Sequence, residues 1–166
     1  MLNNLITDAY IGLGSNLQNP FDQVLSAIDE IALLPASKLI TKSSLYLSKP
    51  MGPADQPSYV NAVVQIETRL EAEHLLHELQ AIEQQHGRTR KAEQWGPRTL
   101  DLDILVYGKH AVNNSQLVIP HPGIRYREFV LYPLHEVNKH LMIPGMGKIN
   151  RLRSRCHTNG MTQYYA

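Results

Sequence analysis

The stretch that decides the fold is Arg98-Thr99-Leu100-Asp101-Leu102-Asp103-Ile104-Leu105-Val106-Tyr107. One face of it is aliphatic and consists of Leu100, Leu102, Ile104 and Val106. This two-residue period predicts a β-strand with one face in the core. The other face begins with Asp101 and Asp103, and in a strand both carboxylates point the same way with Cα atoms roughly 6.5–7 Å apart. Because neighbouring like charges repel, we interpret the pair as a ligand for Mg²⁺ that bridges a substrate's phosphates.

A cation-rich segment leads into this strand. Residues 88–98 contain a single acid, Glu93, and the cations Arg88, Arg90, Lys91 and Arg98. Glycine and proline at positions 87, 96 and 97 interrupt regular structure, so the segment is predicted to be a loop. Guanidinium groups grip phosphate oxygens bidentately, so the loop and the carboxylates together favour a site for ATP-Mg²⁺. The alternative is a solvated basic loop beside a strand that ends in surface acids.

The whole chain is typical of one folded domain. It has 166 residues, and we expect a single domain over 1–166, with a core at about 8–145 and a tail at about 146–166. Its formal net charge of +1 provides no global field toward nucleic acid or membrane. Cys156 is the only cysteine, which excludes an internal disulfide, and residues 1–7 lack a signal-peptide pattern. We therefore expect a cytoplasmic protein.

The remaining periodicities predict strands and helices in a fixed order. Strands are expected at 8–13, 39–47 and 59–68, and helices at 19–35 and 71–86, before the strand at 100–107. The stripe of the first helix would consist of Phe21, Val24, Leu25, Ile28 and Ile31. A short strand at 117–119 and a short helix at 124–131 would follow. After Pro144 we expect a loosely ordered tail.

The order β-α-β-β-α-β is that of the ferredoxin-like fold. We therefore predict an α+β protein with an antiparallel sheet, both helices on one face, and a C-terminal strand and helix extension. The first and third strands would be central, with the 100–107 strand beside the first, so that Asp101, Asp103, Tyr59 and Asn61 converge. Tyr59 and Asn61 can stack on and hydrogen-bond a flat heterocycle, although an ordinary solvent-facing pair explains them equally well.

Several motifs, taken together, resemble those of one family. Residues 96–105, Gly-Pro-Arg-Thr-Leu-Asp-Leu-Asp-Ile-Leu, closely resemble the signature of the 6-hydroxymethyl-7,8-dihydropterin pyrophosphokinases of folate biosynthesis. The resemblance covers roughly positions 9–145 and continues in residues 10–16, 52–57 with 59–61, 87–91 with Trp95, and 120–122 with 127–129. Gln94 departs from the signature, which usually carries a charged residue there.

The resemblance implies an enzyme that transfers the diphosphate of ATP to the pterin hydroxymethyl group and releases AMP. Asp101 and Asp103 would ligate two Mg²⁺ ions and, with Arg88 and Arg98, form the catalytic set. The implied ATP contacts are Gln80, Glu83, Arg88, Arg90, Trp95, Arg98, Ile104, Val118, His121 and Arg127. Of these, Arg90 and Trp95 would belong to a loop that closes over the nucleotide, and Ile104 and Val118 would meet adenine through backbone groups.

The resemblance also implies a pterin pocket. Tyr59 and Phe129 would stack on the ring and Asn61 would hydrogen-bond its edge. The remaining implied pterin contacts are Gly14, Ser48, Met51 and Trp95.

Two other functions are compatible with parts of the pattern. A Mg²⁺-dependent nucleotidyltransferase would attack the α-phosphorus and release pyrophosphate rather than AMP. An RNA-binding ferredoxin-like module would need exposed aromatic residues on its central strands, where this chain has only Tyr10 and Tyr59. We therefore expect pterin and ATP as partners, no nucleic acid or membrane, and a monomer.

Overall fold

The computed structural model describes residues 2–50, 55–87 and 99–164. Its main elements, in chain order, are β1 (Leu2–Ser15), α1 (Pro20–Ala32), β2 (Ser37–Lys42), β3 (Leu45–Ser48), β4 (Tyr59–Leu70), α2 (Ala72–Gln85), β5 (Asp101–Tyr107), α3 (Glu128–Val137), α4 (Ile149–Ser154) and β10 (Thr162–Tyr164). The minor elements are β6 (Val112–Asn113), β7 (Val118–Ile119), the 3-10 turn η1 (Ile124–Tyr126), β8 (Met142–Ile143) and β9 (Gly147–Lys148).

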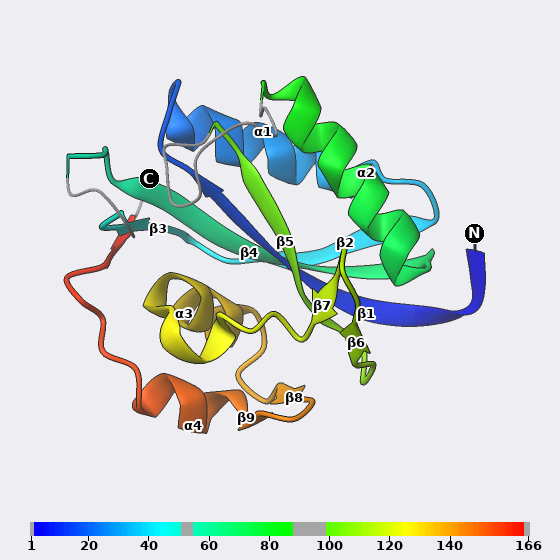
Figure 1. Ribbon diagram of the computed structural model, residues 1–166. Helices are drawn as coiled ribbons and strands as arrows, with labels where there is room; N and C mark the ends of the chain where they lie inside the picture. Colours follow the sequence, from blue (N-terminus) through cyan, green and yellow to red (C-terminus); the bar gives the residue numbers. More distant parts are fainter. Residues whose placement is uncertain (1, 51–54, 88–98, 165–166) are drawn as a thin grey trace.

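A six-stranded antiparallel sheet organises the molecule (Figure 1). Its strands lie in the order β10-β3-β4-β1-β5, and β2 pairs with the same edge of β4 as β3 does. Strand β1 therefore lies between β4 and β5, as the sequence predicted. The predicted ferredoxin-like order is confirmed, with the second predicted strand divided into β2 and β3.

Helices α1 and α2 cover one face of the sheet (Figure 1). The buried stripe of α1 consists of Val24, Ala27, Ile28 and Ile31. Leu25, predicted to belong to this stripe, is 45% exposed, because Ala27 faces the sheet instead. The inward residues of β4 meet this layer as predicted and are Val60, Ala62, Val64 and Ile66. Gly87, with φ +83°, follows the end of α2 in the left-handed conformation expected there.

Helix α3 covers the opposite face, and α4 packs against α3 on the side away from the sheet (Figure 1). A second apolar cluster fills this layer, where Val63 and Leu105 from the sheet pack with Leu131, Leu134 and Ile149. The helix predicted at 124–131 is instead the turn η1 followed by the longer α3. The sheet is thus buried on both faces, by different segments of the chain.

Two expectations, about the second strand and about the C-terminal tail, are wrong. The strand expected at 39–47 is interrupted at Ser43, whose hydroxyl accepts a 2.9 Å hydrogen bond from the Val63 N–H in place of a regular ladder contact. The tail after Pro144 is not loosely ordered, because it contains α4 and the strand β10, which pairs with β3. Tail residues such as Met146 and Leu152 also pack against the second apolar cluster.

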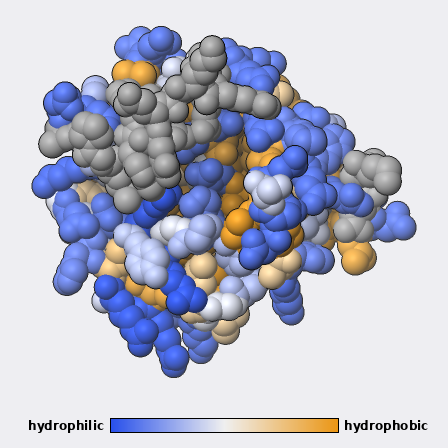
Figure 2. All heavy atoms as spheres, in the orientation of Figure 1, coloured by the Kyte–Doolittle hydropathy of each residue, from blue (hydrophilic) through white to orange (hydrophobic). Residues whose placement is uncertain are grey.

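The surface is mostly hydrophilic on the face shown in Figure 2, with an apolar strip in a central recess. Among the described residues, no helix has the length and apolar character needed to cross a bilayer.

Candidate active site

One pocket gathers most of those expected site residues that the structure describes. It has a volume of about 250 Å³ and lies between the sheet and the start of α3. The expected site residues that line it are Gly14, Ser48, Tyr59, Asn61, Asp101, Asp103, His121, Arg127 and Phe129. These residues come from four strands, a loop and a helix start, so the antiparallel sheet brings together positions far apart in the sequence.

The two aspartates occupy one side of β5. Both are partly exposed and both line the pocket, as their two-residue spacing predicted. The neighbouring strand β1 carries glycine opposite each of them, because Gly12 pairs with Asp103 and Gly14 pairs with Asp101. Neither partner carries a side chain, so β1 contributes only backbone opposite the carboxylates, and Leu105 packs against Gly12, where an added Cβ would lie 3.4 Å from its methyl carbons.

The donor set of this pair suits a hard divalent cation. Within residues 2–50, 55–87 and 99–164 there is no cluster of three acidic, histidine or cysteine side chains that could enclose a metal. Mg²⁺ is commonly held by one or two carboxylates, with water and substrate phosphates completing its octahedral shell. Asp101 and Asp103 therefore fit a magnesium ion that arrives with a nucleotide better than a fully enclosed structural metal.

His121 is held rigidly at the edge of the carboxylate pair. Its backbone N–H donates to the Leu105 carbonyl at 2.9 Å, and its Nδ1 accepts from the Gly123 N–H at 3.0 Å. Since Nδ1 is an acceptor, the proton of the neutral ring lies on Nε2, which is 3.9 Å from Asp103 Oδ2. Burial and the Arg127 guanidinium lower the pKa of His121, while Asp101 partly opposes them. His121 is therefore a neutral hydrogen-bond donor at pH 7.

Arg127 and Phe129 form the wall of the pocket contributed by the start of α3. The Arg127 guanidinium carbon lies 6.0 Å from the centroid of the Phe129 ring. The Arg127 side chain crosses Gly123 so closely that an added Cβ there would lie 2.7 Å from the guanidinium carbon. Gly123 thus allows a cationic group to approach the pocket that contains the carboxylates.

Asn61, Ser48 and Tyr59 form the opposite part of the pocket. Asn61 Nδ2 donates to Ser48 Oγ at 2.7 Å and to the Tyr46 carbonyl at 3.3 Å, which orients the carboxamide. Its Oδ1 consequently faces Gly14, where an added Cβ would lie 3.4 Å from Oδ1 and 3.8 Å from the Tyr59 ring. The glycine leaves a slot in which an N–H at the edge of a flat ring can reach the Asn61 oxygen.

Four expected nucleotide contacts do not line this pocket. Gln80 and Glu83 lie on α2, and Glu83 is only 6% exposed. The Glu83 Oε2 atom accepts a 2.9 Å hydrogen bond from the backbone N–H of Leu102, which lies between the two aspartates. Ile104 is in the core and Val118 is 41% exposed on β7. Glu83 thus has a structural contact that the sequence did not reveal.

Further expected site residues lie outside the described part of the chain. They are Met51, Arg88, Arg90, Trp95 and Arg98, and Gln94 lies in the same segment as the last four.

Sequence reasoning missed Lys49, which lines the pocket beside Ser48. The only signal for it was its place next to Ser48 in a segment rich in proline and glycine. It also missed Leu105 and Val130, which contribute apolar surface to the pocket.

The comparisons with known proteins agree with one another. Residues 10–139 match the sequence profile of the family described as 7,8-dihydro-6-hydroxymethylpterin-pyrophosphokinase. A 2-amino-4-hydroxy-6-hydroxymethyldihydropteridine pyrophosphokinase of Haemophilus influenzae is 51% identical over 144 residues, covering 87% of this chain and 89% of the relative. The protein of the same name from Pseudomonas aeruginosa is 43% identical over 157 residues, covering 95% of this chain and 96% of the relative.

Solved structures share the fold of this chain. A crystal structure of Plasmodium falciparum HPPK-DHPS superposes on this chain with a TM-score of 0.72 at 13% sequence identity. At this sequence identity the likeness shows only a shared fold. The match covers 92% of this chain and 43% of that one, so the chain spans less than half of the solved protein. From the profile match and the close relatives, we conclude that the chain belongs to the 7,8-dihydro-6-hydroxymethylpterin-pyrophosphokinase family.

Proposed function

We propose that the pocket between the sheet and α3 is where ATP and 6-hydroxymethyl-7,8-dihydropterin meet. As a member of its family, the protein is an ATP-dependent pyrophosphokinase that transfers the diphosphate of ATP to the pterin hydroxymethyl group. One observation carries the placement of the reaction. The carboxylate pair and the slot beside Asn61 line the same pocket, so that a cation site and a site for a flat ring are adjacent.

Asp101 and Asp103 are the residues that would hold magnesium, and we propose two ions. The bound ions would neutralise charge on the phosphate chain and lower the pKa of the pterin hydroxyl. The chain's own contribution is geometric, because β5 presents both carboxylates on one side and β1 places glycine opposite each.

His121 and Arg127 are proposed to bind the phosphate chain. The neutral imidazole donates through Nε2–H, and the guanidinium supplies a positive charge with several N–H donors. The family resemblance adds Arg88, Arg90 and Arg98, with Trp95 on the same segment. It also adds Gln80, Glu83, Ile104 and Val118 near the nucleotide, and these assignments rest on the resemblance.

The pterin is proposed to occupy the slot beside Gly14. Asn61 Oδ1 accepts a hydrogen bond from an N–H group at the ring edge, because Nδ2 is committed to Ser48. Tyr59 and Phe129 provide aromatic faces for stacking, and Ser48 closes the far edge. The resemblance assigns Met51 and Trp95 to the same ring.

The reaction is an in-line displacement at the β-phosphorus. The bond between the pterin oxygen and the β-phosphorus forms, and the bond from the β-phosphorus to the oxygen shared with the α-phosphorus breaks, leaving AMP. The protein's contribution to such a step is positioning and charge stabilisation. His121 serves as a donor because its pKa is lowered and its Nδ1 is already an acceptor.

The proposal is tested by replacing each carboxylate. We expect Asp101→Asn and Asp103→Asn to lower the rate of AMP formation about 10²–10³-fold, the usual effect of removing one charge-stabilising group. Asp8→Asn is the matched control, since Asp8 lies on β1 and does not line the pocket. Near-normal turnover of either variant in saturating Mg²⁺ would contradict the metal assignment. Release of pyrophosphate in place of AMP would indicate the nucleotidyltransferase.

We also propose that the monomer is the active unit, because one chain supplies every residue that lines the pocket. Light scattering coupled to gel filtration, at the enzyme concentration used in the assay, tests this.

A further inference from the structure

The C-terminal segment contacts both walls of the pocket although it lies outside the stretch that matches the family profile. The profile match ends at residue 139. Residues 156–164, here called the strap, run from the end of α4 back to the sheet and add the strand β10 to its edge (Figure 1).

The strap is attached to the wall that contains Ser48. Strand β10 pairs antiparallel with β3, with Gln163 opposite Tyr46 and Thr162 opposite Leu47. The Gln163 side chain donates to Ser44 Oγ at 2.7 Å, at the start of β3. Because Ser48 ends β3 and accepts the hydrogen bond that orients Asn61, the strap supports the strand that positions the Asn61 side of the pterin slot.

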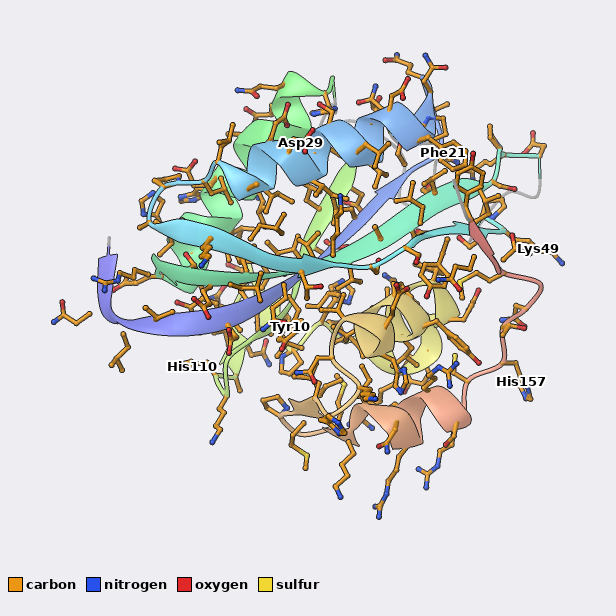
Figure 3. All side chains as sticks on the ribbon, turned by 180° about the vertical axis from the view of Figure 1, so that it is seen from behind. Tyr10, Phe21, Asp29, Lys49, His110 and His157 are labelled. Atoms are coloured by element: carbon orange, nitrogen blue, oxygen red, sulfur yellow. The ribbon has the colours of Figure 1, made fainter. Side chains whose placement is uncertain are left out.

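The strap also touches Lys49, the pocket residue next to Ser48. Gly160 adopts φ +78°, and an added Cβ there would lie 3.5 Å from both Cε and Nζ of Lys49. Figure 3 shows Lys49 on the side of the molecule where the C-terminal segment turns back toward the sheet. The glycine thus brings the strap backbone alongside the Lys49 side chain.

The strap is attached to the second wall as well. Asn159 Nδ2 donates to Glu128 Oε2 at 3.4 Å, and the Tyr132 hydroxyl donates to the Cys156 carbonyl at 3.0 Å. Glu128 is the first residue of α3, is 8% exposed and directly precedes Phe129. The strap therefore contacts the end of α3 that carries the aromatic wall of the pocket.

The other end of α3 has a separate attachment to the sheet. Glu136 accepts hydrogen bonds from the Ser44 N–H and hydroxyl at 2.9 Å each and from the Tyr46 hydroxyl at 2.5 Å. These bonds fix the C-terminal end of the helix to the beginning of β3. The strap connects the N-terminal end of the helix to the same strand, so both ends of α3 are attached to β3.

We propose that the strap is a positioning element that sets the width of the pterin half of the pocket, between Ser48–Lys49 and Phe129. The proposal rests on the assignment of that half to the pterin. Loosening the strap would let the start of α3 move relative to β3 while Glu136 still holds the far end. The pterin would then lose contacts, whereas Asp101 and Asp103 on β5 would keep theirs.

Substitutions at Gln163 test the proposal in the full-length protein. Gln163→Ala removes the hydrogen bond to Ser44, and Gln163→Pro also disturbs the pairing of β10 with β3. We expect the KM for the pterin to rise about tenfold, as for the loss of one or two hydrogen bonds, with kcat and the KM for ATP within about twofold of wild type. Thr162→Ala changes an exposed side chain of the same strand and should match wild type.

The same variants are titrated with 6-hydroxymethyl-7,8-dihydropterin in the presence of a non-hydrolysable ATP analogue. A selective loss of pterin affinity supports the proposal. If Gln163→Pro does not fold, the pterin affinity of Gln163→Ala alone tests it. A lower melting temperature with an unchanged pterin KM, or an equal rise in both KM values, would overturn it. If wild type formed no AMP, the proposed function would fail instead, and the titration would still show whether the strap affects pterin binding.

Discussion

Replacing Glu83 by alanine tests whether this buried carboxylate supports β5, the strand with the proposed magnesium ligands, or contacts the nucleotide. Glu83 Oε2 accepts the Leu102 N–H at 2.9 Å, and Leu102 separates Asp101 from Asp103. Alanine removes this hydrogen bond to a charged acceptor and leaves the buried N–H of Leu102 without its Glu83 acceptor. Each kind of loss is typically about 1–3 kcal/mol, so we expect the free energy of unfolding to fall by about 3 kcal/mol. For a protein of this size, that lowers Tm by roughly 6–12 °C.

Glutamine at the same position separates hydrogen bonding from charge. Glu83→Gln retains a carbonyl oxygen that can accept the Leu102 N–H, so we expect a loss of only about 1 kcal/mol. Gln84→Ala changes the next residue, whose side chain is exposed, and should leave stability within about 0.5 kcal/mol of wild type. The three variants share a helix and differ only in the contact with β5.

The measurements are urea unfolding, for the free energy, and steady-state kinetics with ATP varied at saturating Mg²⁺. Displacement of β5 in Glu83→Ala should lower kcat/KM for both substrates, because both aspartates move with Leu102. A Glu83→Ala protein with wild-type stability and a raised KM for ATP alone would refute this reasoning, since it would show that Glu83 contacts the nucleotide instead.

Two further predictions concern the pterin slot and pH. Gly14→Ala should raise the KM for the pterin at least about tenfold without changing the KM for ATP, since the new methyl group lies 3.4 Å from Asn61 Oδ1; unchanged pterin kinetics would contradict the slot. Burial lowers the pKa of His135 below 6.5, and the nearby Arg153, Lys139 and His140 lower it further. Burial and the Arg127 guanidinium also lower the pKa of His121. The unfolded chain therefore binds these protons more tightly, and the free energy of unfolding should fall as the pH drops below 6.5. Urea unfolding at pH 7.5, 6.5 and 5.5 should show that the free energy of unfolding depends less on pH in His135→Gln than in wild type. The same pH dependence in both proteins would exclude a contribution from His135.

Much of the sheet could be predicted because a two-residue period reports directly on burial. In β4, Val60, Ala62, Val64 and Ile66 face the layer of α1 and α2, whereas Tyr59 and Asn61, at alternate positions, share the pocket side. The same logic placed both aspartates of β5 on one side. The topology followed from the order of the elements, and it brought these strands next to each other.

The parts that could not be predicted depend on contacts between distant segments. The order of the tail comes from pairing with β3 and packing on the cluster around Leu131, and neither partner is visible in the local pattern of residues 146–164. The interruption at Ser43 comes from a side-chain hydrogen bond to Val63, which periodicity does not report. The contact of Glu83 with Leu102 and the position of Lys49 likewise depend on tertiary structure.

Gly14 pairs with Asn61 on one side and with Asp101 on the other, which has a consequence for substrate length. Adjacent strands are 4.7–4.9 Å apart, so the ladder sets Asn61 and Asp101 about 9.5 Å from each other at the backbone. The backbone of the sheet fixes this separation, and side-chain motion changes it little. Consider a pterin analogue whose hydroxyl group is one carbon farther from the ring. If its ring edge bound at Asn61 as proposed, its hydroxyl would lie beyond Asp101 and Asp103. With the proposed placement of the pterin and the magnesium ions, we therefore expect the enzyme to select its substrate by length as well as by shape.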